Sequence, residues 1–157
     1  MYQPFDANEW TGRVDAEEGP GGQRWHQVVR GASPGSLGAA AKEPPGVALL
    51  GFASDLGVAR NHGRIGAAAG PAALRGQLGN LPATFSVPLY DAGTVTVDAS
   101  QPSALEDGQT EYASQVARLL SGGNSVIGLG GGHEIAWASY QGLREYHVSA
   151  PPQTANV

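Results

Sequence analysis

The chain has no cysteine among its 157 residues. Disulfide bonds and metal sites built from thiolates are therefore excluded, and the composition fits the reducing conditions of the cytosol. Basic residues are also scarce, because nine Lys and Arg stand against fourteen Asp and Glu, which gives a net charge of −5. The chain has no basic cluster of the kind that nucleic-acid-binding proteins present, so we expect no nucleic-acid partner.

Long apolar runs are missing as well. No stretch approaches the roughly 20 apolar residues that cross a bilayer. Residues 1–10 lack the basic region and the apolar core of a secretory signal. We therefore expect a cytoplasmic protein with no membrane partner. Glycine and proline, by contrast, are frequent, at 24 and 11 residues, which predicts long loops around the apolar segments that remain.

Three short apolar segments predict buried strands, at residues 46–52, 87–90 and 125–129. Each strand is followed by a helical pattern, so strands and helices alternate along the chain. This alternation predicts an α/β fold with a parallel sheet and helices on both faces. Because right-handed crossovers bring the carboxyl ends of such strands to one edge of the sheet, the loops that follow them should meet there.

The three predicted helices have recognisable starts and apolar faces. The first begins at Pro71 and ends before Pro82, as expected of proline at a helix start and beyond a helix end. The second opens with a capping box formed by Ser103 and Glu106. The third follows the glycines at residues 130–132. The expected apolar faces are Leu74, Leu78 and Leu81 in the first helix, Leu105, Tyr112, Val116, Leu119 and Leu120 in the second, and Ala136, Tyr140 and Leu143 in the third.

The most informative stretch runs from Asn124 to Leu143 and predicts a strand, a glycine turn and a helix. His133 lies directly after the glycines, at the sheet edge where open α/β proteins bind ligands. A neutral imidazole there serves as a metal ligand or general base, or simply caps the helix through a hydrogen bond. The residues alone leave these roles open. His133 also occupies the last glycine position of a dinucleotide fingerprint starting at Gly128, so that fingerprint fails.

The segment after the first strand, residues 53–70, is a long loop with few side chains to bury. Ordered loops of this length at the carboxyl end of a strand are usually functional. For two acidic residues near this edge the sequence predicts structural roles. We expect Asp91 to be a turn residue at the end of the second strand, and Glu134 to stabilise the helix start through the helix dipole.

Three stretches carry a resemblance to a known family. They are GLGGGHEIAWASYQGL at residues 128–143, the segment at residues 51–78, and RWHQVV at residues 24–29. The first resembles the first metal-binding motif of the ureohydrolases, the arginase and agmatinase superfamily. With glutamate after the histidine, it looks most like the formimidoylglutamase branch of that superfamily.

The resemblance implies a fold and a division of the chain. The fold would be a partial three-layer αβα arginase-like ureohydrolase fold with a parallel sheet, from which the C-terminal half is missing. Residues 1–45 would be an N-terminal extension with loops, residues 46–147 the N-terminal half of the α/β domain, and residues 148–157 a linker-like tail. The later Asp-x-His-x-Asp and Asp-x-Asp motifs of the family do not occur in the chain.

The resemblance also implies a reaction, the manganese-dependent hydrolysis of N-formimidoyl-L-glutamate to L-glutamate and formamide in histidine degradation. His133 matches the first histidine ligand of a site that holds two Mn²⁺ ions, and Arg60, Asn61 and Arg64 are the expected contacts of the small-molecule substrate. The alternative for Asn61 and Arg64 is that they only organise the loop. No residue is assigned as catalytic. The complete enzyme could form a homo-oligomer, whereas the short chain is expected to be inactive alone. The alternatives are a non-catalytic fragment, a small-molecule binding module of the same fold, or another ureohydrolase such as an agmatinase or arginase.

Overall fold

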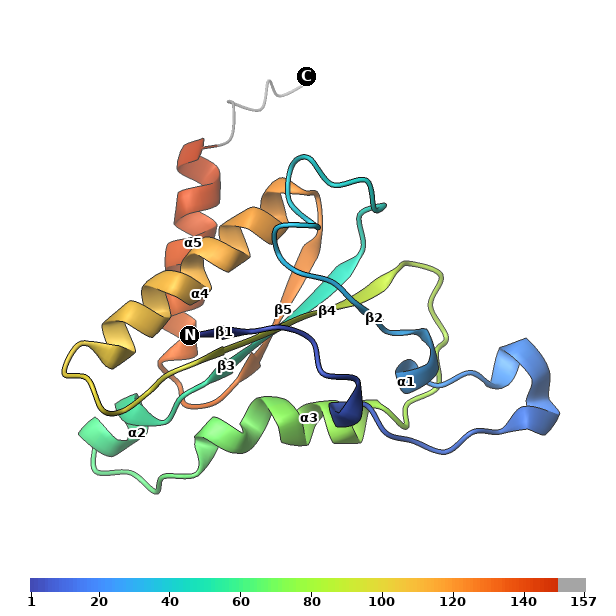
Figure 1. Ribbon diagram of the computed structural model, residues 1–157, viewed down its shortest axis with the longest axis horizontal. Coiled ribbons are helices and arrows are strands. Elements are labelled where there is room, and N and C mark those ends of the chain that lie inside the picture. The colour runs from blue at the N-terminus through green and yellow to red at the C-terminus, as the bar shows by residue number, and fades with distance from the viewer. Residues whose placement is uncertain (150–157) are drawn as a thin grey trace, which may run out of the picture.

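Three parallel strands form the centre of the molecule, in a computed structural model that describes residues 1–149. They are β3 (Val47–Ala53), β4 (Leu89–Thr96) and β5 (Ser125–Gly130). β3 lies between the other two and pairs with both in parallel. The three strands and their parallel pairing therefore confirm the arrangement predicted from the alternating pattern (Figure 1).

Helices cover both faces of this sheet. α4 (Ala104–Ser121) and α5 (Ile135–Ser149) lie on one face, and α3 (Gly70–Leu78) lies on the other (Figure 1). β3 shows how one strand serves both layers, because successive side chains of a strand point to opposite faces. Ala48, Leu50 and Phe52 join the cluster that includes residues of α4 and α5. Leu49 joins a second cluster with Trp10. The result is the expected partial three-layer αβα fold.

Residues 1–45 contribute more to the sheet than their loop-like sequence indicates. The short elements of this region are β1 (Tyr2–Gln3), η1 (Ala7–Glu9), η2 (Ala16–Gly22), α1 (Trp25–Val28) and β2 (Arg30–Gly31). β1 pairs with β4 in antiparallel orientation and β2 pairs with it in parallel. Strands of two residues carry no periodicity, so no local pattern predicts them.

The prediction of a turn at Asp91 is wrong. β4 continues through Asp91 to Thr96, and Asp91 is completely buried within it. The pairing register with β3 shifts opposite this segment, where Gly93 has a φ of 79°. The Asp-Ala-Gly sequence therefore marks an irregularity of the kind found at β-bulges, in which the strand bends and continues.

The predicted faces of two helices also need correction. In α3 the buried side chains include Pro71 and Arg75, whereas Leu74 is exposed, as is Leu81 beyond the helix end. In α5 the buried residues are Ala138 and Gly142. The α5 residues that were expected to face the core of the domain are all exposed, namely Ala136, Tyr140 and Leu143. α5 packs closely on α4 through small residues, which a search for large apolar side chains overlooks.

The second predicted helix is confirmed, with one exception at its start. Leu105, Tyr112, Val116 and Leu119 are buried along α4 as expected. The predicted capping box is absent, because the Ser103 hydroxyl donates a hydrogen bond to the Asp107 carboxylate at 2.7 Å and caps no backbone group.

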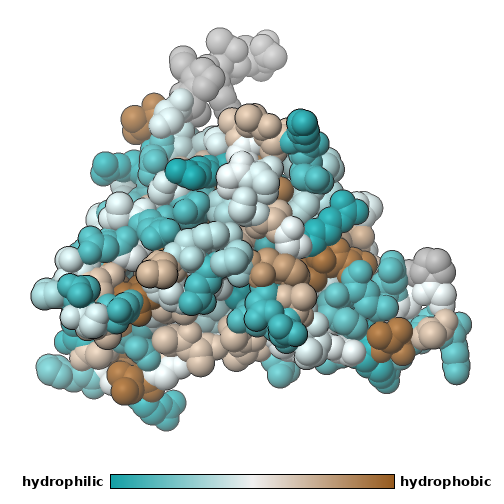
Figure 2. Space-filling model, viewed as in Figure 1, coloured by the Kyte–Doolittle hydropathy of each residue, from teal (hydrophilic) through white to brown (hydrophobic). Residues whose placement is uncertain are grey.

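The predicted tail begins within a helix. α5 runs to Ser149, so Val148 and Ser149 of the predicted tail are helical, and residues 150–157 of that tail lie outside the described residues. Within residues 1–149 no helix combines the length and the apolar character required to span a bilayer. Hydrophilic residues cover most of the face shown in Figure 2, with apolar residues between them in small groups.

Candidate functional site

The turn between β5 and α5 holds His133 at the carboxyl edge of the sheet. The turn docks directly on the end of the neighbouring strand, since the Gly132 amide donates a hydrogen bond to the Ser54 carbonyl oxygen at 2.8 Å. A Cβ atom on Gly131 would lie only 2.2 Å from the same oxygen. Glycine is therefore required for this close approach, and the glycine run fixes where the imidazole stands.

His133 borders a hollow of about 430 Å³, which we call the His133 hollow. Its lining residues are Gly57, Val58, Asn61, Gly63, His133 and Glu134. The sequence predicted that the loop after the first strand and His133 would meet at one edge, and the structure confirms this for Asn61. His133 is exposed and lines the hollow, so its side chain is accessible to an external ligand.

The long loop after β3 contains a short helix, α2 (Leu56–Arg60), which ends directly before Asn61. A further turn, η3 (Ala67–Ala69), leads into α3. The Asp55 carboxylate accepts a hydrogen bond from the Gly66 amide at 2.7 Å and so closes residues 55–66 into a compact segment, which we call the arm. The loop is therefore an ordered structure that presents Asn61 to the His133 hollow.

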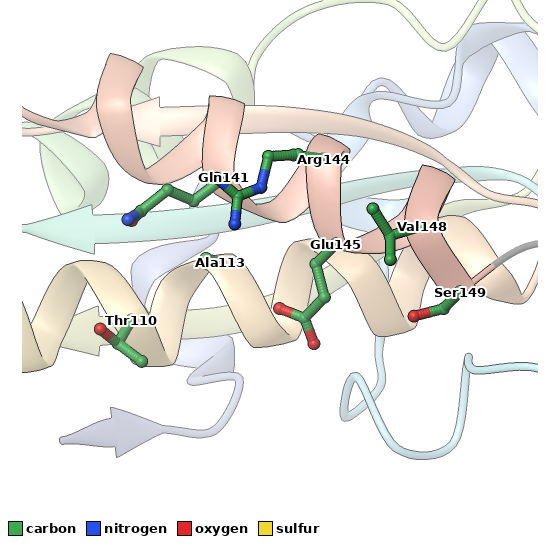
Figure 3. A pocket seen from close by; sticks show the side chains of 7 residues that line it. All are labelled: Thr110, Ala113, Gln141, Arg144, Glu145, Val148 and Ser149. Carbon is green, nitrogen blue, oxygen red and sulfur yellow. The ribbon is translucent and has the colours of Figure 1, made fainter.

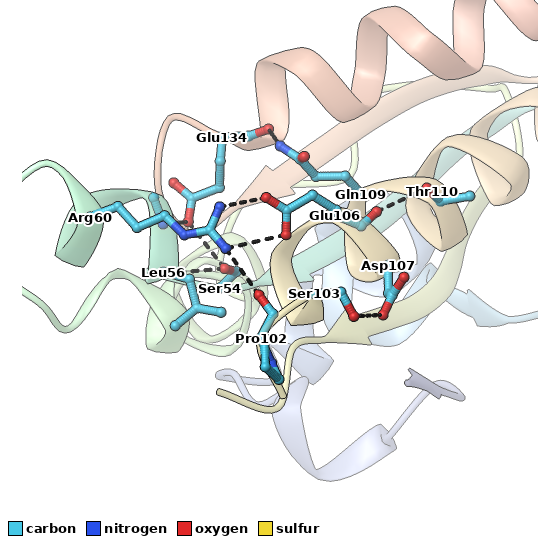
Figure 4. Close-up of polar contacts among 11 residues, drawn as sticks. Ser54, Leu56, Arg60, Pro102, Ser103, Glu106, Asp107, Gln109, Thr110 and Glu134 are labelled. Carbon is cyan, nitrogen blue, oxygen red and sulfur yellow. Dashed lines mark hydrogen bonds and ion pairs between the residues drawn. The ribbon is translucent and has the colours of Figure 1, made fainter. Parts of the chain in front are cut away.

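Arg60 points toward α4 and not into the His133 hollow (Figure 4). Its guanidinium forms two hydrogen bonds with the Glu106 carboxylate, Nη1 to Oε1 at 2.5 Å and Nη2 to Oε2 at 3.2 Å. This contact lowers the pKa of the Glu106 carboxyl. Arg64 lies exposed in the arm and is not among the residues that line the hollow. Of the three residues expected to bind substrate, Asn61 alone lines the hollow beside His133.

Glu134 makes contacts across the site that the sequence did not reveal. Its Oε1 atom accepts hydrogen bonds from the Ser54 hydroxyl and from the Gly57 amide, both at 3.0 Å (Figure 4). These donors lie 80 and 77 positions away in the sequence. The side chain thus reaches back to α2, whereas we expected only an effect on the helix dipole. The position of Glu next to His was visible in the sequence, but its partners were not.

A manganese site requires more ligands than this region supplies. Mn²⁺ binds several oxygen ligands together with imidazole. Within residues 1–149, no group of three or more His, Asp or Glu side chains is close enough to hold a metal ion. The neighbouring carboxylate, Glu134, is already engaged with Ser54 and Gly57. The described residues therefore offer His133 as one candidate ligand and do not complete a site.

A second hollow, of about 300 Å³, lies between α4 and α5 (Figure 3). Its lining residues are Thr110, Ala113, Gln141, Arg144, Glu145, Val148 and Ser149. It lies in the helical layer, away from the carboxyl ends of the strands, and contains no histidine. We therefore place the candidate site at the His133 hollow.

Comparison with known proteins shows which family the chain resembles. The model of the arginase family, described by that name, matches residues 45–155. The formimidoylglutamase of Aromatoleum aromaticum is 48% identical over 152 residues, which cover 93% of this chain and 42% of that protein. The formimidoylglutamase of Ralstonia nicotianae is 48% identical over 157 residues, which cover 100% of this chain and 46% of that protein. The chain thus spans less than half the length of these curated relatives.

A solved structure shows the same similarity. The crystal structure of a variant of the Trypanosoma cruzi formiminoglutamase with Mn²⁺ superposes with a TM-score of 0.58 and 30% sequence identity. The similarity covers 73% of this chain and 40% of that one.

Proposed function

The chain belongs to the arginase family, and we propose that it is part of a manganese-dependent formimidoylglutamase. The observation that carries this proposal is the 48% identity to formimidoylglutamases over the full length of the chain. The placement of His133 at the carboxyl edge of the sheet, beside Asn61, supports it independently.

The proposed reaction is the hydrolysis of N-formimidoyl-L-glutamate. Water adds to the formimino carbon, the bond between that carbon and the glutamate nitrogen breaks, and the products are L-glutamate and formamide. When bound, manganese ions lower the pKa of a water molecule and so supply the nucleophile. His133 is the ligand that we assign to this chain. The remaining ligands are assigned to the part of the relatives' length that this chain does not span.

Three side chains of the arm are proposed to recognise the substrate. The substrate carries carboxylates, which Arg binds through two parallel hydrogen bonds. Arg64 is exposed and Asn61 lines the His133 hollow, so both are accessible to a substrate held there. Arg60 would have to exchange its carboxylate partner Glu106 for a carboxylate of the substrate.

We also propose that the protein acts in the cytoplasm on this small molecule, with neither nucleic acid nor membrane as a partner. The net charge of −5 and the lack of cysteine support this proposal. A homo-oligomer is proposed for the complete enzyme only.

The experiment combines this chain with the remainder of a relative. Residues 1–157 are expressed alone and together with the complementary part of the Ralstonia nicotianae formimidoylglutamase, and formamide release is measured with Mn²⁺. We expect no release from the chain alone and release from the pair. His133→Ala should abolish the release, and His147→Ala, at an exposed position on α5, should not.

Two outcomes would overturn the proposal. One is a pair that folds together and binds manganese but releases no formamide. The other is a pair that hydrolyses agmatine or arginine in preference to N-formimidoyl-L-glutamate, which would assign the chain to another branch of the family. Release from the chain alone, lost in His133→Ala, would show that its own residues complete the metal site.

A further inference from the structure

We propose that Glu134 is a positioning residue that holds α2 against the turn carrying His133, and thereby sets the place of Asn61 across the His133 hollow. This inference rests on the proposed function in one respect, because it treats the hollow as the place where substrate binds. The structural part, a carboxylate that fixes α2, stands on contacts alone.

The first support is the pair of hydrogen bonds to one carboxylate oxygen. Oε1 of Glu134 accepts from the Ser54 hydroxyl and from the Gly57 amide, each at 3.0 Å. Ser54 is buried at the end of β3, and Gly57 is the second residue of α2. Hydrogen bonds to an ionised acceptor are roughly twice as strong as neutral ones. Glu134 therefore connects the turn after β5 to both the end of β3 and the start of α2.

The second support is that the N-cap residue of α2 leaves the helix start largely unsatisfied, since the Ser54 hydroxyl accepts a hydrogen bond from the Leu56 amide at 3.3 Å but not from the Gly57 amide. The first amides of a helix have no partner within the helix. Asp55 stands at the N-cap position of α2, but its side chain makes no capping hydrogen bond there and binds the Gly66 amide instead. A helix of five residues also has little stability of its own. The Glu134 carboxylate supplies the acceptor for one of these amides from a distant part of the chain.

The third support is the space made for the carboxylate. A Cβ atom on Gly132 would lie 2.0 Å from Oε2 of Glu134, and one on Gly57 would lie 2.8 Å from the same atom. Any larger residue at Gly132 would therefore displace the carboxylate. The main chain of Glu134 is held as well, since its carbonyl oxygen accepts a hydrogen bond from Nε2 of Gln109 in α4 at 3.0 Å (Figure 4).

The consequence concerns Asn61, which follows the last residue of α2. Two carboxylates hold α2 from different elements: Glu134 binds its start, and Glu106 of α4 binds its last residue, Arg60 (Figure 4). If Glu134 releases the start, α2 can move relative to the turn, and the separation of Asn61 and His133 changes. A shift of this kind would disturb substrate binding while leaving His133 on its own turn.

The test compares three variants of Glu134 in the 157-residue chain by amide hydrogen exchange. Glu134→Gln keeps an oxygen that can accept both hydrogen bonds, although they are weaker without the charge, so the exchange rate of the Gly57 amide should rise only slightly above the wild-type rate. Glu134→Ala removes the acceptor, and Glu134→Asp keeps the charge but is one methylene too short to reach. Both should raise the exchange rate of the Gly57 amide by about tenfold or more, which corresponds to about 1.4 kcal/mol, because each loses a hydrogen bond to a charged acceptor.

The pattern of the three variants separates positioning from a helix-dipole effect. If charge alone matters, Glu134→Asp will behave like the wild type and Glu134→Gln will behave like Glu134→Ala, which would overturn the proposal. The amide of Leu50 in the buried strand β3 serves as the internal reference for global unfolding. Glu106→Ala is the matched control, because it frees Arg60 but leaves the acceptor of the Gly57 amide in place. Should Glu134→Ala fail to fold, Glu134→Asp and Glu134→Gln still give opposite expectations.

A second measurement uses the reconstituted pair described above. Glu134→Asp should raise KM for N-formimidoyl-L-glutamate by about tenfold with manganese affinity unchanged. In Glu134→Gln, KM should stay close to the wild-type value. An unchanged KM in Glu134→Asp would contradict the positioning of Asn61. If the wild-type pair has no activity, the proposed function fails, while the exchange rates at Gly57 still decide whether Glu134 fixes α2.

Discussion

The guanidinium of Arg75 and the carboxylate of Asp91 form a buried, two-point ion pair. Nε of Arg75 lies 2.7 Å from Oδ2, and Nη2 lies 2.9 Å from Oδ1. The exposed fractions of the two side chains are 2% and 0%. Arg75 also donates to Glu9 and Thr94, and Trp10 donates to Asp91. This network connects α3 and the N-terminal residues Glu9 and Trp10 to β4.

Breaking this pair should destabilise the chain strongly. Asp91→Ala leaves the Arg75 guanidinium buried without its main partner, and removing one member of a buried pair costs about 3–5 kcal/mol. The free energy of unfolding in urea measures the loss. Glu106→Ala is the control, because the Arg60–Glu106 pair is half exposed and solvent screens such pairs, so its removal should change the free energy of unfolding little. Equal, small losses in both variants would contradict the role of the buried pair.

The parallel sheet could be predicted because its signals are local. The apolar run at residues 46–52 suits a strand covered on both faces, and the strand observed there is buried along almost its whole length. His133 could be placed at the carboxyl edge for the same reason, since the strand, the glycines and the helix that surround it are contiguous in sequence.

The remaining contacts could not be predicted, because their partners are distant in the sequence. Asp91 followed by alanine and glycine has the local composition of a turn, and Arg75 and Trp10, which keep it in a strand, lie 16 and 81 positions away. For the same reason the hydrogen bond that Glu134 accepts from Ser54 could not be predicted, because Ser54 lies 80 positions away. Arg60 carries a positive charge in a loop that the sequence predicts to be functional, yet only the three-dimensional structure shows that Glu106 already neutralises it.

Stability should fall at alkaline pH because of Tyr112. Burial raises the pKa of its hydroxyl from 10.0 to about 12. Between these values the unfolded chain releases the proton while the native chain retains it. The unfolded state then binds fewer protons, so the free energy of unfolding decreases as pH rises from about 10 to about 12. A pKa difference of about two units corresponds to a loss of at most about 3 kcal/mol.

The measurement is urea unfolding of the wild type and of Tyr112→Phe across this pH range. In the described part of the chain the Tyr112 hydroxyl makes no hydrogen bond of normal geometry, and the nearby Ser139 side chain offsets the effect of burial on its pKa only in part, so removing the hydroxyl should cost little below about pH 10. The stability difference between the two proteins should then shift in favour of Phe above about pH 10. A difference that is independent of pH would show that Tyr112 titrates normally.

Substrate recognition by the arm is testable in the reconstituted pair. Arg64→Ala should lower kcat/KM for N-formimidoyl-L-glutamate by about tenfold to a hundredfold, the equivalent of about 1.5–3 kcal/mol for a lost charged contact. Manganese affinity, measured by titration, should change little. If neither Arg64→Ala nor Arg60→Ala alters the kinetics, the arm does not contact the substrate carboxylates.

Glu106→Ala distinguishes the two candidate partners of Arg60. If Arg60 leaves Glu106 to bind a substrate carboxylate, removing Glu106 abolishes that competition and should lower KM. If Arg60 only fastens α2 to α4, Glu106→Ala and Arg60→Ala should have similar, small effects on KM. The two variants remove the same ion pair, so their comparison isolates the interaction with substrate.

The free edge of β5 should make the isolated chain self-associate. β5 is the last strand of the sheet among the described residues, so one of its edges has unpaired backbone groups. Ile127 on this strand is 47% exposed, and on α5 the stacked rings of Trp137 and Tyr140 are 54% and 53% exposed. An apolar edge strand is a template for pairing with another chain, and a lysine placed on it opposes that pairing.

Sedimentation velocity at increasing protein concentration measures this association. The wild-type chain should show a rising average sedimentation coefficient, and Ile127→Lys should remain a monomer over the same range. Val14→Lys is the matched control, because Val14 is 60% exposed but lies outside every strand. It should associate like the wild type, and circular dichroism should show that all three proteins are folded. A wild-type chain that stays monomeric, or a control that dissociates as fully as Ile127→Lys, would show that the β5 edge does not mediate pairing.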